Sequence, residues 1–113
     1  MAEVEIVRSL VLEIKKRFDR GEANRVIDLI ESTKDHPHKG KPLGPVGGLL
    51  IKEVRYRDFR FYFLVDAEKL KFFDEAALAD LLLRLVRMSD KKTQARVIEE
   101  IRQVLLRIGP AGF

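Results

Sequence analysis

The stretch KEVRYRDFRFYF, near the middle of the chain, alternates charged side chains with apolar and aromatic ones. If its RD step forms a two-residue turn between strands, Arg55 lies opposite Arg60 and Glu53 lies opposite Tyr62 on one face. Like charges in opposed positions destabilise a strand pair by roughly a few tenths of a kcal/mol or more. Either the Glu53 carboxylate bridges the two arginines, or the arginines bind a phosphate between them.

Positive charge is concentrated around this stretch. The segment Thr33–Tyr62 carries seven basic and three acidic residues, and this accounts for the whole net charge of +4, since the rest of the chain carries 15 residues of each sign. A localised positive surface on an otherwise neutral chain is typical of a protein that binds a polyanion. Lys39, Lys41, Lys52 and Arg57 are therefore candidate RNA-binding residues. The alternative is that they are solvated charges of a basic protein.

The content of histidine and cysteine limits the other chemistry available. The chain has no cysteine, which excludes disulfides, thiol nucleophiles and thiolate metal sites. His36 and His38 are two residues apart, but no further ligand follows at a suitable spacing, so we expect neither a metal nor a cofactor. We interpret both histidines as part of a basic loop.

The N-terminal part of the sequence predicts a strand followed by a helical hairpin. Residues 4–7 form the strand, and Gly21 is expected to end the first helix. Apolar residues recur at helical spacing on either side of that glycine, at Leu10, Val11, Ile14 and Phe18 and then at Ala23, Val26, Leu29 and Ile30. Residues 36–48 contain three prolines and four glycines, which predicts a long surface loop.

Two strands, at residues 49–57 and 59–65, flank the central turn. By alternation, the aromatic residues of this hairpin other than Tyr62 form the face that covers the helices, so Arg60 is expected to lie on the solvent face. Lys52 falls on the core side of the pattern. Either its ammonium group reaches out to solvent, or a bulge shifts the register.

The C-terminal part of the sequence admits two interpretations. Residues 70–73 are a candidate third strand, and Asp74 is a suitable N-cap for a helix over residues 74–88. The run LLLRLVRM, at residues 81–88, also suits a central strand, and the sequence leaves both interpretations open. Ser89 is expected to cap the last helix.

These elements predict one α+β domain over residues 1–113, with a small antiparallel β-sheet packed against an N-terminal helical hairpin and C-terminal helices. No apolar run reaches the ~18 residues of a membrane span, and the acidic start is unlike a secretion signal. We therefore expect a soluble, cytoplasmic protein with no membrane partner.

Four short motifs resemble the RelE/HigB/ParE toxin superfamily of toxin-antitoxin systems. They are GKPL at residues 40–43, KEVR at residues 52–55, FRFYF at residues 59–63, and KKTQ at residues 91–94, before the last helix. The resemblance covers most of the chain and implies a compact β-α-α-β-β-β fold. In the RelE branch, it implies a toxin that enters the ribosomal A site, cleaves mRNA and is silenced by an antitoxin wrapped around it.

The resemblance also implies roles for individual residues. Arg60 matches the arginine that binds the region of the scissile phosphate, and Arg55 matches the arginine of the family's E-L-R strand. Lys91 and Lys92 match the basic pair that precedes the last helix.

Cleavage of this kind uses no metal, because the ribose 2′-hydroxyl attacks its own phosphate while the protein supplies positive charge, a base and an acid. Arg55 and Arg60, with Lys92 approaching from the last helix, would stabilise the developing phosphorane. Glu53 and Tyr62 are the candidates for proton transfer.

Three functions are compatible with these residues and motifs. The first is a ribosome-dependent mRNA endoribonuclease, whose partners are mRNA on the ribosome and an acidic, helical antitoxin. The second is a catalytically inactive RelE-fold module that binds RNA or protein, and the third is a ParE-like gyrase inhibitor. The inactive module is favoured by departures from RelE, because RelE lysines are replaced by Ile51 and Glu53 and its C-terminal tyrosine has no counterpart in the GPAGF tail. Homo-oligomer formation is also left open.

Overall fold

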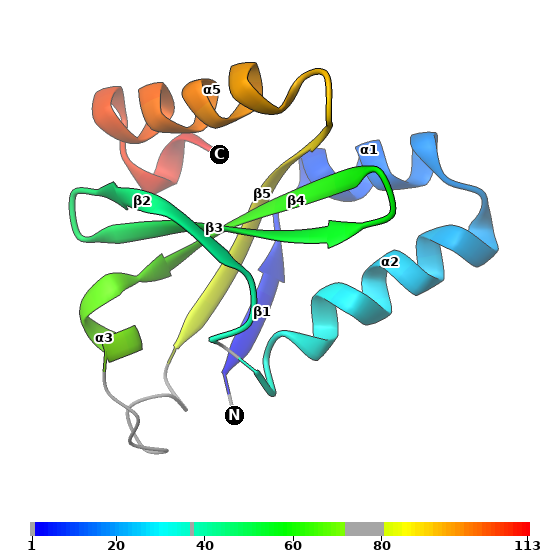
Figure 1. Ribbon diagram of the computed structural model, residues 1–113, viewed down its shortest axis with the longest axis horizontal. Helices are drawn as coiled ribbons and strands as arrows, with labels where there is room; N and C mark the ends of the chain where they lie inside the picture. Colours follow the sequence, from blue (N-terminus) through cyan, green and yellow to red (C-terminus); the bar gives the residue numbers. More distant parts are fainter. Residues whose placement is uncertain (1, 37, 72–80) are drawn as a thin grey trace.

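The computed structural model of the chain describes residues 2–36, 38–71 and 81–113. It confirms the predicted α+β class, with a five-stranded, mostly antiparallel sheet (Figure 1). In chain order, the elements are β1 (Glu3–Ile6), α1 (Arg8–Arg17), α2 (Arg20–Ser32), β2 (Lys41–Val46), β3 (Leu49–Tyr56), β4 (Phe59–Asp66), α3 (Ala67–Lys71), β5 (Leu82–Asp90), α5 (Gln94–Arg107) and a 3₁₀ turn, η1 (Pro110–Gly112).

The strands lie in the order β1-β5-β4-β3-β2. β1 and β5 are parallel, and the other neighbouring pairs are antiparallel. The last strand therefore lies between the first strand and the central β3–β4 hairpin, so the sheet unites residues from both ends of the described chain.

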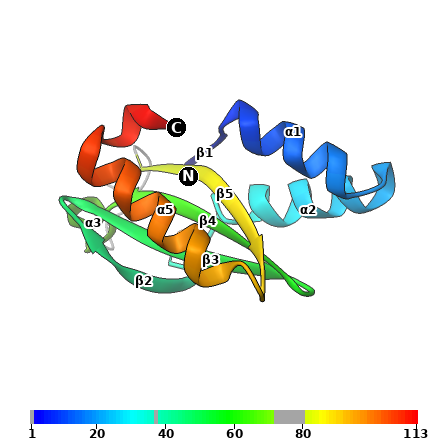
Figure 2. The same ribbon diagram turned by 90° about the horizontal axis from the view of Figure 1, so that it is seen from above.

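Helices lie on both faces of the sheet (Figure 2). On one face, Phe18, which follows α1, packs edge-on against Tyr56 and Phe59 with ring centroids 6.0 and 4.9 Å away. On the other face, Glu100 of α5 pairs with Arg87 of β5. A sheet covered on both faces needs apolar residues at successive positions, and β4 and β5 are accordingly buried along most of their length.

The central hairpin has the predicted register. Arg55 lies opposite Arg60, and Glu53 lies opposite Tyr62. Arg57 begins the two-residue turn with a φ of 54°, in the left-handed region that such hairpin turns require.

Residues 82–88 lie in a strand, so the second interpretation of the LLLRLVRM run is confirmed. β5 lies between β1 and β4. Its apolar residues are nearly continuous because both faces are covered, and such a run fits a helical period by chance. The predicted helix over residues 74–88 is wrong for this part of its length. Its other part, residues 74–80, lies outside the described residues, as does the expected Asp74 cap.

Leu70 belongs to α3 and not to a third hairpin strand. Asp66 ends β4, and its Oδ1 accepts hydrogen bonds from the main-chain N–H groups of Glu68 and Lys69 at 2.9 and 3.1 Å. These bonds start a helix directly after the strand. Residues 72–73 of the proposed strand lie outside the described residues.

Gly21 does not end the first helix. α1 stops at Arg17, and α2 begins at Arg20 because the Asp19 carboxylate accepts a hydrogen bond from the Glu22 N–H at 2.7 Å. Gly21 lies in the first turn of α2.

The predicted loop at residues 36–48 contains β2, an edge strand. Pro42 and Pro45 fit there because the outer side of an edge strand needs no N–H donors. The register shifts between Pro42 and Gly44, where β2 pairs irregularly with β3. A strand this rich in proline and glycine has no strand signal of its own and depends on β3 as a template.

Candidate nucleic-acid interface

The structure brings four of the five predicted catalytic residues together on one face of the central hairpin. Glu53 and Arg55 are two residues apart on β3, and Arg60 and Tyr62 occupy the opposed positions on β4. Ser89 of β5 lies beside Arg60 in the register of the sheet. We call Glu53, Arg55, Arg60 and Tyr62 the hairpin cluster.

Glu53 and Arg60 form a buried ion pair. Arg60 Nε lies 3.3 Å from Glu53 Oε1, and the two side chains are 8% and 1% exposed, respectively. Arg55 Nε lies 3.9 Å from Glu53 Oε2, but the Arg55 side chain is 59% exposed. The sequence offered two explanations for the opposed arginines. The structure contains the first of them, because the Glu53 carboxylate bridges Arg55 and Arg60.

Arg60 does not lie on a solvent face, contrary to the prediction. α5 crosses this face from one side of the hairpin to the other. Arg87 Nε on β5 donates to Glu100 Oε1 at 3.0 Å, and Arg102 Nη2 donates to the Leu43 carbonyl on β2 at 3.2 Å. The sequence shows that this helix is amphipathic, but it does not show which face of the sheet the helix covers.

Tyr62 is fully buried on this covered face. Its hydroxyl and Ser89 Oγ share a hydrogen bond of 2.7 Å. Burial raises the pKa of the Tyr62 phenol, since the charged form loses its hydration. In this arrangement the phenol is a neutral, hydrogen-bonded core group. The partnership with Ser89 was not foreseeable, because it depends on the register of β5.

Arg55 is the exposed member of the hairpin cluster, and it borders a hollow of about 280 Å³. Lys39 and Lys41, both exposed, line the same hollow from the chain that leads into β2. Leu29 of α2 and Val54 of β3 contribute apolar surface. Glu53 also lines the hollow, but its carboxylate is paired with Arg60 and Arg55. The three cations from two segments therefore make this concavity suitable for an anionic ligand.

Gly40 shapes this hollow. Its φ is +100°, and a Cβ at this position would lie 2.8 Å from the main-chain oxygen of Glu53. Only glycine lets the chain pass so close to β3 in this backbone conformation.

Lys52 lies on the opposite face, away from the hairpin cluster. It is 2% exposed, and its Nζ lies 5.7 Å from the centroid of the Phe63 ring. Burial lowers the pKa of the ammonium group. Alternation placed Lys52 correctly on the core side. The side chain does not reach solvent, and the register between β3 and β4 is unbroken here.

Lys91 and Lys92 are exposed in the turn between β5 and α5. Asp90 closes this turn, because its Oδ1 accepts hydrogen bonds from the main-chain N–H and the hydroxyl of Thr93 at 2.8 and 3.0 Å. These bonds lower the pKa of the Asp90 carboxyl group. Ser89, the predicted cap, is still part of the strand.

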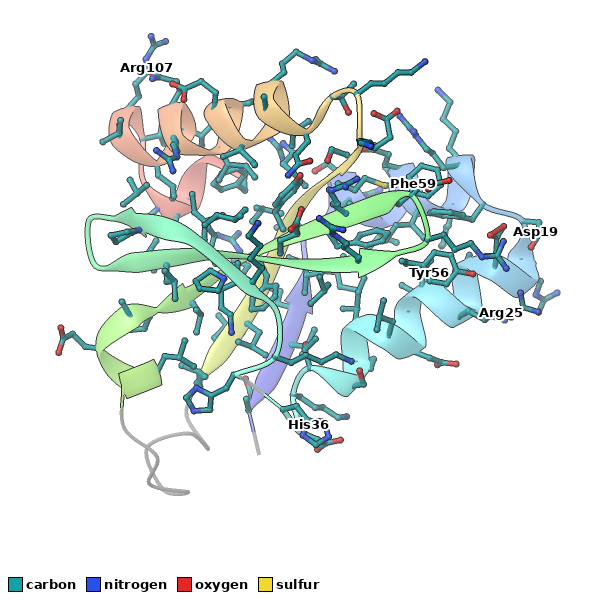
Figure 3. The ribbon with its side chains drawn as sticks, in the orientation of Figure 1. Asp19, Arg25, His36, Tyr56, Phe59 and Arg107 are labelled. Atoms are coloured by element: carbon teal, nitrogen blue, oxygen red, sulfur yellow. The ribbon has the colours of Figure 1, made fainter. Side chains whose placement is uncertain are left out.

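Two further arginines lie at the end of the hairpin. Arg57 is 65% exposed, contacts Glu22 at 3.1 Å and lies 5.5 Å from the Tyr56 ring centroid. Arg17 lies 5.7 Å from the Phe59 ring centroid. Figure 3 shows Tyr56 and Phe59 at this end of the molecule, toward α1 and α2. Arg17 is not among the predicted RNA-binding residues, because it lies outside Thr33–Tyr62, the segment in which the net positive charge is concentrated.

No group of three or more His, Asp or Glu side chains within the described residues is placed to hold a metal ion. His36 and His38 are exposed at the start of the segment that leads to β2.

Comparisons of the chain with family models, with curated proteins and with solved structures found no match. Among the described helices, none is both long enough and apolar enough to cross a membrane.

Proposed function

We propose that this chain binds RNA through Arg55, Lys39 and Lys41 and acts as a RelE-like, ribosome-dependent mRNA endoribonuclease in the cytoplasm. The observation that carries the proposal is the exposed Arg55 guanidinium beside a hollow that the two lysines also line. A guanidinium is always charged and offers paired donors to phosphate oxygens. The motif resemblance supplies the reaction class.

In this proposal, Arg55 contacts the scissile phosphate and stabilises the charge that develops on it. The Glu53 carboxylate, held by Arg60, keeps Arg55 at the edge of the hairpin cluster, so Arg60 acts as a positioning residue. Lys91 and Lys92 contact RNA from the turn before α5. Glu53 and Tyr62 reach a proton of the substrate only after α5 moves away from this face.

The second candidate is a module that binds RNA without cutting it. The burial of Glu53, Arg60 and Tyr62 favours it, because an acid or a base must come within hydrogen-bond reach of the reacting proton. Both candidates use the same exposed cations and differ only in the chemical step.

Controlled expression in bacteria, with mapping of transcript 5′ ends, tests the proposal. We expect growth arrest with new ends inside translated codons for the wild type, and neither effect for Arg55→Ala. Arg107→Ala is the matched control, because this exposed arginine lies at the far end of α5 (Figure 3). Its toxicity should equal that of the wild type.

Other outcomes separate the alternatives. Salt-dependent RNA binding without new transcript ends, even with ribosomes present, would select the binding module. A DNA-damage response without mRNA cuts would select gyrase inhibition. The proposal includes an acidic, helical antitoxin as partner, and an adjacent short reading frame of that composition would support it.

A further inference from the structure

The main-chain groups of Arg55 face the hollow where β3 has no strand partner. The two-residue turn makes Tyr56 and Phe59 a hydrogen-bonded pair, and this pattern alternates along the hairpin. The N–H and C=O of Arg55 therefore point away from β4, toward the side that β2 occupies. β2 begins only at Lys41, opposite Glu53. Within the described chain, no strand pairs with β3 at Arg55 on that side.

Beside Arg55, the chain that leads into β2 turns away from β3. The Lys39 N–H donates to the His36 carbonyl at 2.9 Å, which commits it to a turn and not to the sheet. Gly40 then brings the chain close to the Glu53 carbonyl before β2 pairs. What remains beside Arg55 is a strand edge with one donor and one acceptor.

The surroundings of this strand edge are those of a small ligand site. Leu29 and Val54 offer apolar surface, and Lys39, Lys41 and the Arg55 side chain supply positive charge. The volume of about 280 Å³ is close to the lower end of known ligand pockets, about 300 Å³. The site therefore suits one flat, polar-edged ring attached to an anionic backbone.

We propose that this hollow binds a single nucleobase of the RNA strand. The Arg55 N–H and C=O hydrogen-bond to the edge of the base, Leu29 and Val54 contact its face, and the two lysines bind the neighbouring phosphates. Bases of single-stranded RNA are recognised through such edge and face contacts. The inference rests on the proposed function and adds base recognition at the same site. An extended peptide would also pair with the strand edge, but the cationic surroundings favour a nucleotide.

The Arg55 amide proton gives a direct test by ¹⁵N NMR. With adenosine, guanosine, cytidine or uridine monophosphate, we expect its resonance to move downfield for at least one base. With ribose 5-phosphate or inorganic phosphate, it should stay in place. Equal shifts with ribose 5-phosphate would show phosphate binding alone and overturn the inference. A shift produced by an extended peptide and by no mononucleotide would overturn it as well.

A variant that fills the hollow without touching its cations provides the second test. Leu29→Phe should abolish the Arg55 shift and weaken binding of a short single-stranded RNA by about tenfold or more, as the loss of one paired base edge implies. Leu12→Phe, on the exposed surface of α1, is the control and should change neither. Retained shift and affinity in a folded Leu29→Phe protein would contradict the inference.

The two proposals fail in different ways. If the wild type cuts mRNA and Arg55→Ala abolishes the cuts, but no mononucleotide moves the Arg55 amide, the base site is wrong and the proposed function stands. If a mononucleotide moves the amide but neither RNA binding nor cleavage is found, the proposed function is wrong.

Discussion

At the scale of single residues, burial changes the role of Arg60. Its side chain is 8% exposed and pairs with a carboxylate that is 1% exposed. Removing one partner of a buried ion pair leaves the other charge without compensation, so Arg60→Ala should lower the free energy of unfolding by about 3–5 kcal/mol. Arg55→Ala, which removes a side chain that is 59% exposed, should change it by no more than about 0.5 kcal/mol. Urea denaturation of both variants measures the difference.

A double variant tests whether Arg60→Ala destabilises the protein by leaving the Glu53 charge without a partner. Glu53→Leu with Arg60→Met replaces both charges by apolar groups, and such replacements of buried pairs are often neutral or stabilising. We therefore expect the double variant to recover most of the stability that Arg60→Ala loses. If Arg60→Ala is instead as stable as Arg55→Ala, then Arg60 is not a structural partner of Glu53.

At the scale of the elements, Gly40 controls how β2 joins the sheet. An alanine there combines a strained backbone conformation with a contact of 2.8 Å between its Cβ and the Glu53 carbonyl, so Gly40→Ala should lower the free energy of unfolding by about 1–3 kcal/mol. Gly48→Ala is the control, because an added Cβ there meets nothing within 4 Å and the φ is not left-handed. Thermal denaturation compares the two. Equal melting temperatures would contradict the role given to Gly40.

The turn between β5 and α5 should make stability depend on pH. The Thr93 hydrogen bonds lower the pKa of Asp90 below its ordinary value of 3.8, so their stabilisation is present above that pH and is lost as the pH falls through the lowered pKa. Asp90→Asn keeps an acceptor oxygen but does not titrate. We expect its unfolding free energy, measured in urea across acidic pH, to fall less steeply than that of the wild type. Identical slopes would show that Asp90 contributes nothing to acid unfolding.

The elements that were predictable are those whose signal is local. Alternation and the turn gave the register of β3 and β4, which put Arg55 opposite Arg60. The position of β5 in the sheet and the formation of strand β2 depend on pairing with neighbouring strands, which a local sequence pattern does not specify. The cluster was therefore foreseen, but its burial was not, because burial depends on where α5 lies.

At the scale of the whole molecule, α5 divides the candidate site into a covered part and an open part. Arg60 and Tyr62 are buried on the face that α5 crosses, whereas Arg55, Lys39 and Lys41 surround a hollow at the edge of β3. Binding and cleavage thus make different demands on the fold. Binding uses groups that are already accessible, and cleavage by the covered groups requires α5 to move.

This division predicts that loosening α5 affects stability more than RNA binding. Ile101 is fully buried in the core on α5, so Ile101→Ala should lower the free energy of unfolding by about 2–5 kcal/mol. Leu106→Ala, on the same helix but 69% exposed, should change it by no more than about 0.5 kcal/mol. Under conditions where each variant remains folded, both should bind RNA like the wild type, because the cations around the hollow are unchanged. Urea denaturation and fluorescence anisotropy with a labelled RNA measure the two quantities. A folded Ile101→Ala protein that no longer binds RNA would show that α5 takes part in binding, and the division of the site into two parts would then be wrong.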